Sequence, residues 1–380
     1  MRLISVRRVT SVCALAALAE VLFDNAIAPL LPELEDRLGL SQTLAGVLVA
    51  TSGIAYMLGA YPALRFASTV GPRATALIGM GCVVAGTLTF AENSSIAVLI
   101  AGRALAGFGS VVIYTGVVAV GVAFAGSANR GATIGTIYSG FYAGSALAPF
   151  VGAAAVAFGR GPVFVLLGAA QLAIAGLVAR LPPVPAEPTA TIGGLFGYLL
   201  DGRVRLGLWV ASLGPFGLGA LVVSGSHRIA EAGGTPLSIA VAFGGIAVVN
   251  AVSAPVVGRV SDQRGRGLPL FALMLLAAVV LVILVPIQDR ILLIVLIVVG
   301  GALFTLVGGP GFAVVGDAVE SLGGNDAEAT FLMNLFNGPA AALGAILGGV
   351  LHGAAGGGLP FGMLAAVAAL SAGVIYRHLR

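Results

Sequence analysis

The stretch Arg8-VTSVCALAALAEVLFDNAIAPL-Leu31 is long and apolar enough to cross a membrane as a helix. The hydrocarbon core of a bilayer is about 30 Å thick, and roughly 20 helical residues span it. Glu20 and Asp24 lie one helical turn apart within this stretch. Because an ionised group in hydrocarbon costs on the order of 3 kcal/mol by insertion scales, two retained carboxylates indicate a working site.

Stretches of this kind recur from end to end. The chain is 59% hydrophobic and 9% charged, with a mean hydropathy of +1.08, far from the composition of soluble domains. We therefore expect an all-α integral membrane protein with twelve transmembrane helices and no soluble domain. The expected spans are 8–31, 42–66, 73–91, 96–126, 131–159, 162–181, 204–228, 236–260, 268–287, 290–316, 327–353 and 358–378.

The arginines indicate the orientation, because cytoplasmic loops collect basic residues. If the N-terminus is cytoplasmic, the outer loops hold only Arg37, Arg160, Arg228 and Arg290, and the other loop arginines all face inside. We expect a multi-pass protein of the cell membrane with both termini in the cytoplasm. The net charge of +4 comes from this loop bias, so it does not indicate a nucleic-acid partner.

The middle of the chain predicts a division into halves. The segment after Leu181 holds Pro182, Pro183, Pro185 and Pro188. One constant shift places Gly71 on Gly265, Gly107 on Gly301 and Gly144 on Gly338. We expect two six-helix pseudo-repeats, 1–181 and 204–380, joined by a cytoplasmic linker at 182–203.

The loop after the eighth span reads Gly258-Arg-Val-Ser-Asp262-Gln-Arg264-Gly265-Arg266. It resembles the G-x-x-x-D-R-x-G-R-R signature of the major facilitator superfamily, with Gln263 replacing the first basic residue. The resemblance implies a gating loop in which Asp262 meets the positive N-terminus of a helix and the arginines anchor the loop. The alternative is an ordinary basic loop with one acid.

Two further spans resemble the same superfamily. The fourth span carries an intramembrane Arg103 followed by glycines, and the fifth contains Gly144-Ser-Ala-Leu-Ala148-Pro149-Phe-Val-Gly152. The latter is similar to the G-x-x-x-G-P-x-x-G element of the drug:proton antiporter branch, with Ala148 replacing a glycine. Pro149 removes a backbone hydrogen bond, so we expect a hinge formed by Gly144, Pro149 and Gly152, or else a packing kink.

The first span resembles the opening helix of proton-linked drug and amine exporters, in which an acid at the place of Asp24 carries protons or meets a cationic substrate. Glu20 is included in the predicted proton or substrate site only because it lies one helical turn before Asp24. From the expected span limits, Asp24 and Arg103 lie at similar depth below the outer surface and could face each other. Such a pair could switch Asp24 between holding and releasing a proton, or could be a static ion pair.

Weaker candidates for a substrate cavity are polar residues within spans, each of which could equally bond a neighbouring helix: Tyr138, Tyr142, Asn250, Asn334 and Asn337. We expect His227 and Arg228 to be interfacial at the outer end of the seventh span. Solvation explains Asp317 and Glu320 near the cytoplasmic end of the tenth.

The sequence thus predicts a major facilitator fold that acts as a proton-coupled exporter of small lipophilic or cationic compounds by alternating access. The alternatives are a proton-linked nutrient importer and a non-transporting membrane sensor or scaffold. Cys13 and Cys82 fall within spans and no metal-ligand spacing or nucleotide-binding loop is present. We expect a monomer that is not an enzyme, binds no cofactor or metal, and has protons, a small-molecule substrate and lipid as its partners.

Overall fold

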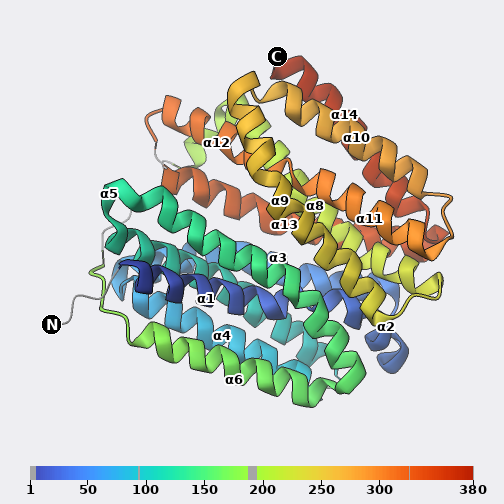
Figure 1. Ribbon diagram of the computed structural model, residues 1–380, viewed down its shortest axis with the longest axis horizontal. Coiled ribbons are helices and arrows are strands. Elements are labelled where there is room, and N and C mark those ends of the chain that lie inside the picture. The colour runs from blue at the N-terminus through green and yellow to red at the C-terminus, as the bar shows by residue number, and fades with distance from the viewer. Residues whose placement is uncertain (1–5, 93–94, 187–194, 325, 380) are drawn as a thin grey trace. The chain divides into compact units, whose positions relative to one another are not determined.

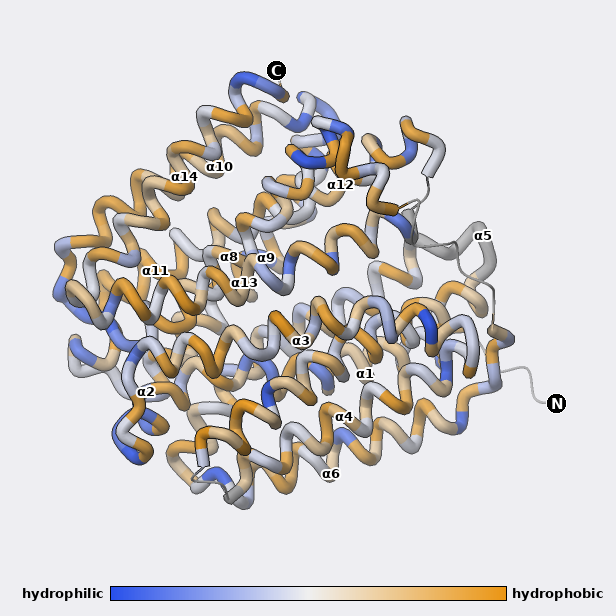
Figure 2. The backbone as a smooth tube through the Cα atoms, turned by 180° about the vertical axis from the view of Figure 1, so that it is seen from behind, coloured by the Kyte–Doolittle hydropathy of each residue, from blue (hydrophilic) through white to orange (hydrophobic). Residues whose placement is uncertain are grey.

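The computed structural model describes residues 6–92, 95–186, 195–324 and 326–379, and all regular structure in these ranges is helical. Twelve helical segments are long and apolar enough to cross a membrane. Figure 2 shows these segments as mainly hydrophobic, with the hydrophilic stretches gathered at loops and helix ends. The helices, labelled in Figure 1, are α1 (Val6–Asp24), α2 (Ile27–Leu38), α3 (Gln42–Thr69), α4 (Pro72–Glu92), α5 (Ile96–Phe158), α6 (Arg160–Ala179), η1 (Phe196–Leu200), α8 (Gly202–Glu231), α9 (Pro236–Arg264), α10 (Gly267–Leu284), α11 (Arg290–Thr305), α12 (Gly308–Ser321), α13 (Asp326–Ala355) and α14 (Leu359–His378).

Spans and helices do not correspond one to one. Helix α5 contains two spans, Ile96–Ala125 and Ala132–Phe158, which fold back on each other where Gly121 lies against Ile137. Conversely, α1 and α2 together form the span Val6–Leu38, and α11 and α12 form Arg290–Ser321. The first span thus extends beyond its expected end at Leu31, so Asp24 lies deeper within it than the sequence estimate places it.

Both interrupted spans break at the residue four positions before a proline. Pro29 follows the break at Asn25, and Pro310 follows the break at Leu306. A proline has no N–H to donate to the carbonyl four residues earlier, and its ring pushes that carbonyl aside. The helical assignment continues through Pro149, by contrast, so the expected hinge on α5 is not marked by a break.

The chain divides by its contacts into two compact units, residues 1–30 with 54–190 and residues 31–53 with 191–380. This division differs from the expected halves in one segment: residues 31–53, the second part of α2 and the first part of α3, pack with the second unit. Gly46 and Gly53 of α3 lie so close to the α13 backbone that an added Cβ would collide with Ala345 and Gly338 respectively. Small residues therefore join this hairpin to α13.

The first unit is packed around α1. Helix α1 lies against α5, where Gly140, Gly144 and Gly152 each have a carbonyl of the first span at the place that a Cβ would occupy. On its other side, Phe23 of α1 meets Phe90 of α4 and Phe164 of α6, with ring centroids 5.0 and 5.9 Å away in edge-on geometry. Figure 1 shows α1, α4 and α6 alongside one another. These contacts fix the end of α1 that carries Asp24.

Both halves turn at an equivalent glycine. Gly71, between α3 and α4, and Gly265, between α9 and α10, have φ of 86° and 80°. Side chains other than glycine rarely adopt this left-handed region. The match between these two glycines, predicted from the constant sequence shift, therefore extends to the backbone conformation.

The two ends of the central linker are each tied to a helix bundle. At the first end, Arg73 donates to the Leu181 carbonyl at 2.6 Å, and at the second, Tyr198 of η1 donates to Glu328 Oε2 at 2.9 Å. The latter bond raises the pKa of the Tyr198 phenol, because it stabilises the protonated form beside a carboxylate. Pro188, one of the expected linker prolines, lies outside the described residues.

Candidate functional site

Asp24 and Arg103 meet in the first unit. Arg103 Nη1 lies 2.9 Å from Asp24 Oδ1 and donates a second bond of 2.9 Å to the Asp24 backbone carbonyl. The two residues thus face each other, although the first span extends further beyond Asp24 than its expected limit. The Arg103 side chain is 3% exposed, whereas that of Asp24 is 30% exposed.

The break in the first span supplies one of these acceptors. In an unbroken helix the Asp24 carbonyl would accept from the N–H of residue 28. Helix α1 ends at Asp24 and α2 begins at Ile27, and at this break the Asp24 carbonyl accepts from Arg103. Asn25, in the break, donates from Nδ2 to Ser145 Oγ on α5 at 3.3 Å. Local backbone geometry thus lets one guanidinium hold both the side chain and the main chain of Asp24.

Arg103 retains unused hydrogen-bonding capacity. Its Nε is buried and has no hydrogen-bond partner among the described residues. A guanidinium has five N–H donors, and leaving one buried and unmatched costs free energy. The arrangement is therefore not a fully satisfied structural ion pair.

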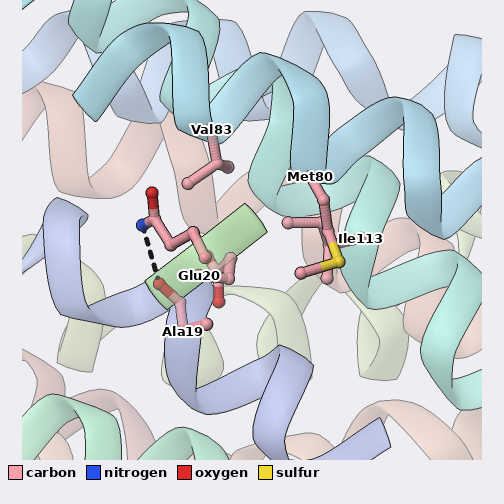
Figure 3. Close-up of a pocket in the computed structure, with 6 residues that line it drawn as sticks. Ala19, Glu20, Met80, Val83 and Ile113 are labelled. Carbon is pink, nitrogen blue, oxygen red and sulfur yellow. Dashed lines mark hydrogen bonds between the residues drawn. The ribbon is translucent and has the colours of Figure 1, made fainter. Parts of the chain in front are cut away.

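Glu20 lies one turn before Asp24 and is 8% exposed. Figure 3 shows it at the wall of a narrow pocket with Met80 and Val83 of α4 and Ile113 of α5. The packed walls leave no room for a water molecule. Gln171 of α6 fixes this turn of α1, because its Nε2 donates to the Ala19 carbonyl at 3.0 Å.

Tyr56 of α3 interacts with the carboxylates, and a row of tyrosines on α5 adjoins it. Tyr138 and Tyr142, predicted as cavity residues on α5, form a row with Tyr114 of the same helix, with adjacent ring centroids 5.5 and 6.4 Å apart. Tyr56 of α3 lies within electrostatic reach of Glu20, Asp24 and Tyr138. The first unit therefore gathers acids, a cation and phenols, which together can bind a proton and a polar or cationic small molecule.

Sequence reasoning missed Tyr56, Tyr114 and Ser110. Ser110 is buried on α5, close enough to Glu20 for the two side chains to interact. A helical wheel could have found Ser110 and Tyr114, because they fall seven and eleven residues after Arg103, on its face of the helix. For Tyr56 the sequence carries no such signal.

The asparagine candidates belong to the second unit. Asn250 Nδ2 donates to Thr305 Oγ1 at 2.6 Å, so its donor serves packing between α9 and α11. Its Oδ1, and that of Asn337, are buried without a hydrogen-bond partner in the described ranges. Asn334 also has an interaction partner. These residues stay predictions as substrate contacts.

The loop after α9 differs in part from expectation. Arg266 forms an ion pair with Asp317 of α12 at 2.7 Å, so Asp317 has a partner and is not merely solvated. Asp262 is exposed, as are Arg264 and Gly265. The predicted gating contact of Asp262 with a helix N-terminus, and the role of Gly258, stay predictions. His227, expected to be interfacial, lies near the end of α8 and is 5% exposed.

Three comparisons place the chain among known proteins. The sequence profile of the Major Facilitator Superfamily matches residues 13–340. No curated protein matches the chain. Among solved structures, a POT family transporter in complex with a thioalcohol-conjugated peptide is 13% identical and superposes with a TM-score of 0.75, covering 96% of this chain and 95% of that one. A mutant peptide transporter POT in complex with sulfate is 16% identical with a TM-score of 0.73, covering 97% and 93%.

At these identities the structural likeness shows the fold alone. The family match, however, covers most of the chain and includes most of the first span, Arg103 and the loop after α9. The twelve spans and the glycine-ended loops agree with it. The chain therefore belongs to the major facilitator superfamily and is a multi-pass membrane transporter with that fold.

Proposed function

We propose that the chain is a proton-coupled secondary transporter in which Asp24 takes up and releases the coupling proton. The observation that carries this proposal is the contact of Arg103 Nη1 with both the carboxylate and the carbonyl of Asp24. When Asp24 is ionised, Arg103 neutralises it. When a proton binds, the charge attraction is lost, but the carbonyl still holds the guanidinium.

The unequal exposure of the pair fits this role. Asp24 is 30% exposed and can exchange a proton with water, whereas Arg103 is buried and keeps its place. Glu20, buried one turn away, is assigned as a positioning helper. Tyr56, Tyr138 and Tyr142 are the substrate contacts that we propose beside it.

Two observations bear on the cargo and the direction. The solved structures with this fold include transporters of peptides, and a peptide is a nutrient rather than a lipophilic drug. These peptide transporters favour a proton-linked nutrient importer over an exporter. The antiporter-like element at Gly144, Pro149 and Gly152, together with the Asp24 match, supports export of small lipophilic or cationic compounds as the second candidate.

The orientation and location complete the proposal. The distribution of arginines supports both termini in the cytoplasm and insertion in the cell membrane. We propose that the monomer is the working unit.

Transport into proteoliposomes under an imposed pH gradient tests the proposal, with labelled dipeptides and cationic dyes as cargo. The wild type should accumulate one cargo class against its gradient. Cargo that moves in the same direction as the protons indicates uptake, and cargo that moves in the opposite direction indicates export. Asp24→Asn should lose uphill accumulation while retaining downhill exchange, because Asn offers the same acceptor oxygen to Arg103 but binds no proton.

Asp36→Asn is the matched control, since Asp36 is an exposed acid further along the same span and should transport like the wild type. Gradient-driven accumulation by Asp24→Asn at the wild-type level would remove Asp24 from the coupling mechanism. A wild type that moves neither cargo class, in either direction, would count against proton-coupled transport of these compounds.

A further inference from the structure

Two buried histidines face each other in the second unit, apart from the Asp24 site. His227 of α8 is 5% exposed and His352 of α13 is 2% exposed, with their ring centroids 5.1 Å apart. Each imidazole contacts one carboxylate: His227 meets Glu35 of α2, and His352 meets Glu231 of α8. The nearby charged groups are thus Glu35 on α2, Arg228 and Glu231 on α8, and the other histidine on α13.

The contacts of His227 require one proton more than a neutral histidine and an ionised glutamate possess. Its Nδ1 lies 2.5 Å from the Val223 carbonyl, which can only accept, so Nδ1 must carry a hydrogen. Its Nε2 lies 2.5 Å from Glu35 Oε1. A neutral imidazole has only one N–H, so Nε2 would then present a lone pair to a carboxylate lone pair. A second proton must lie between these two atoms for the contact to hold.

His352 shows the opposite arrangement. Its Nε2 lies 2.9 Å from Glu231 Oε1, which a neutral ring satisfies with its single N–H. Its Nδ1 is buried without a hydrogen-bond partner among the described residues, so a proton there would be an unmatched buried donor. A second cation 5.1 Å from a charged His227 would also be repelled. The extra proton therefore belongs to the His227 and Glu35 pair.

We propose that His227 and Glu35 bind a proton together and that this proton fastens the end of α2 to α8. We call this pair the proton latch. When the proton leaves to water, the lone pair of Nε2 and the carboxylate repel each other, and this end of α2 separates from α8. In the orientation proposed above, the latch faces the outside.

One residue of the latch lies on the segment 31–53. Residues 31–53 form a hairpin that is continuous with the first unit but packs with the second, and Glu35 is on its first helix. The proposal concerns only contacts within the second unit, and it does not depend on Asp24 or on the cargo.

Distances between spin labels test the latch without a transport assay. Cysteines replace the exposed residues Arg37, on α2, and Gln288, in the loop whose Ile287 carbonyl accepts from Arg228 of α8. Cys13 and Cys82 are changed to Ala in the same chain. Pulsed electron paramagnetic resonance measures the distance at about pH 5 and about pH 9, which bracket ordinary imidazole titration. We expect one distance population at the acid pH and an added, longer population at the alkaline pH.

Glu35→Gln should abolish this response. The amide that this substitution introduces can donate to Nε2 of a neutral ring and accept from a charged one, so the contact survives at both pH values. His227→Gln, which removes the titrating ring, should also give a distance independent of pH. His352→Gln is the control and should retain the wild-type response. A wild-type distance that does not change with pH, or a response retained by Glu35→Gln, would overturn the proposal.

Discussion

At the scale of single residues, removing Asp24 and removing Arg103 should have unequal effects on stability, because the remaining partner is buried to a different extent in each case. Arg103 is 3% exposed and depends on protein acceptors, whereas Asp24 is 30% exposed and depends on them less. Removing one partner of a fully buried pair costs about 3 to 5 kcal/mol, mostly because the other charge remains buried and unpaired. The loss of Asp24 should therefore destabilise the protein more than the loss of Arg103.

We expect Asp24→Ala to lower the free energy of unfolding by about 2 kcal/mol, less than for a fully buried pair because Asp24 is only partly buried. Arg103→Gln should cost less, and adding it to Asp24→Ala should recover part of the loss. Thermal unfolding in detergent can be followed with a thiol-reactive dye, since Cys13 is buried and Cys82 partly buried. Equal losses for both single variants, with an additive double variant, would mean that the pair is not coupled.

The sequence identified Asp24 and Arg103 because ionisable residues are rare in apolar spans and stand out there. It could not identify the role of His227, because its partner Glu35 lies 192 residues away on another helix. Tyr56 was missed for a related reason. A tyrosine is ordinary in a membrane helix, and only tertiary packing decides which polar groups it meets.

At the scale of helices, the span limits followed from hydropathy to within a few residues, except where two helices share one span. Hydropathy is continuous across the breaks at Asn25 and Leu306, so it gives no signal of them. Pro29 and Pro310 do, but Pro62, Pro149, Pro215, Pro255 and Pro339 lie within helices that continue. The position of a proline in the sequence therefore does not by itself predict a break.

Close packing of α5 on the first span leads to a prediction about glycines. Gly152→Ala would place a Cβ against the Ala26 backbone carbonyl, whereas Gly135→Ala on the same helix meets nothing within 4 Å. We expect Gly152→Ala to lower the unfolding temperature and to weaken transport, because the break beside Asp24 must shift. Gly135→Ala should leave the unfolding temperature unchanged or raise it, since Ala favours helix by up to about 1 kcal/mol. Indistinguishable unfolding temperatures for the two variants would show that α1 and α5 can separate freely.

At the scale of the whole chain, the linker and the spacing of glycines predict duplicated halves, and Gly71 and Gly265 share their backbone conformation. The place of residues 31–53 was not predictable. Their sequence is continuous with the first half, but their contacts with α8 and α13 assign them to the second unit. Contacts so distant along the chain leave no periodicity in the sequence.

The orientation of the whole chain can be tested with single cysteines in a background lacking Cys13 and Cys82. Gln288 and Val70 are both exposed, and the arginine distribution predicts that they lie outside and inside respectively. A membrane-impermeant maleimide added to intact cells should label Gln288→Cys at once and Val70→Cys only after permeabilisation. The reverse pattern would invert the proposed topology.

The break between α1 and α2 has a consequence for how readily a carrier can cycle. A site that bound its proton very tightly would release it too slowly for repeated transport. Because the interrupted backbone offers Arg103 a second oxygen at the same nitrogen, the cation needs no new partner each time the carboxyl group changes charge. In the proposed cycle the carbonyl contact keeps the ionised and protonated states of Asp24 close in energy. The interrupted helix therefore favours repeated binding and release of the proton over tight binding.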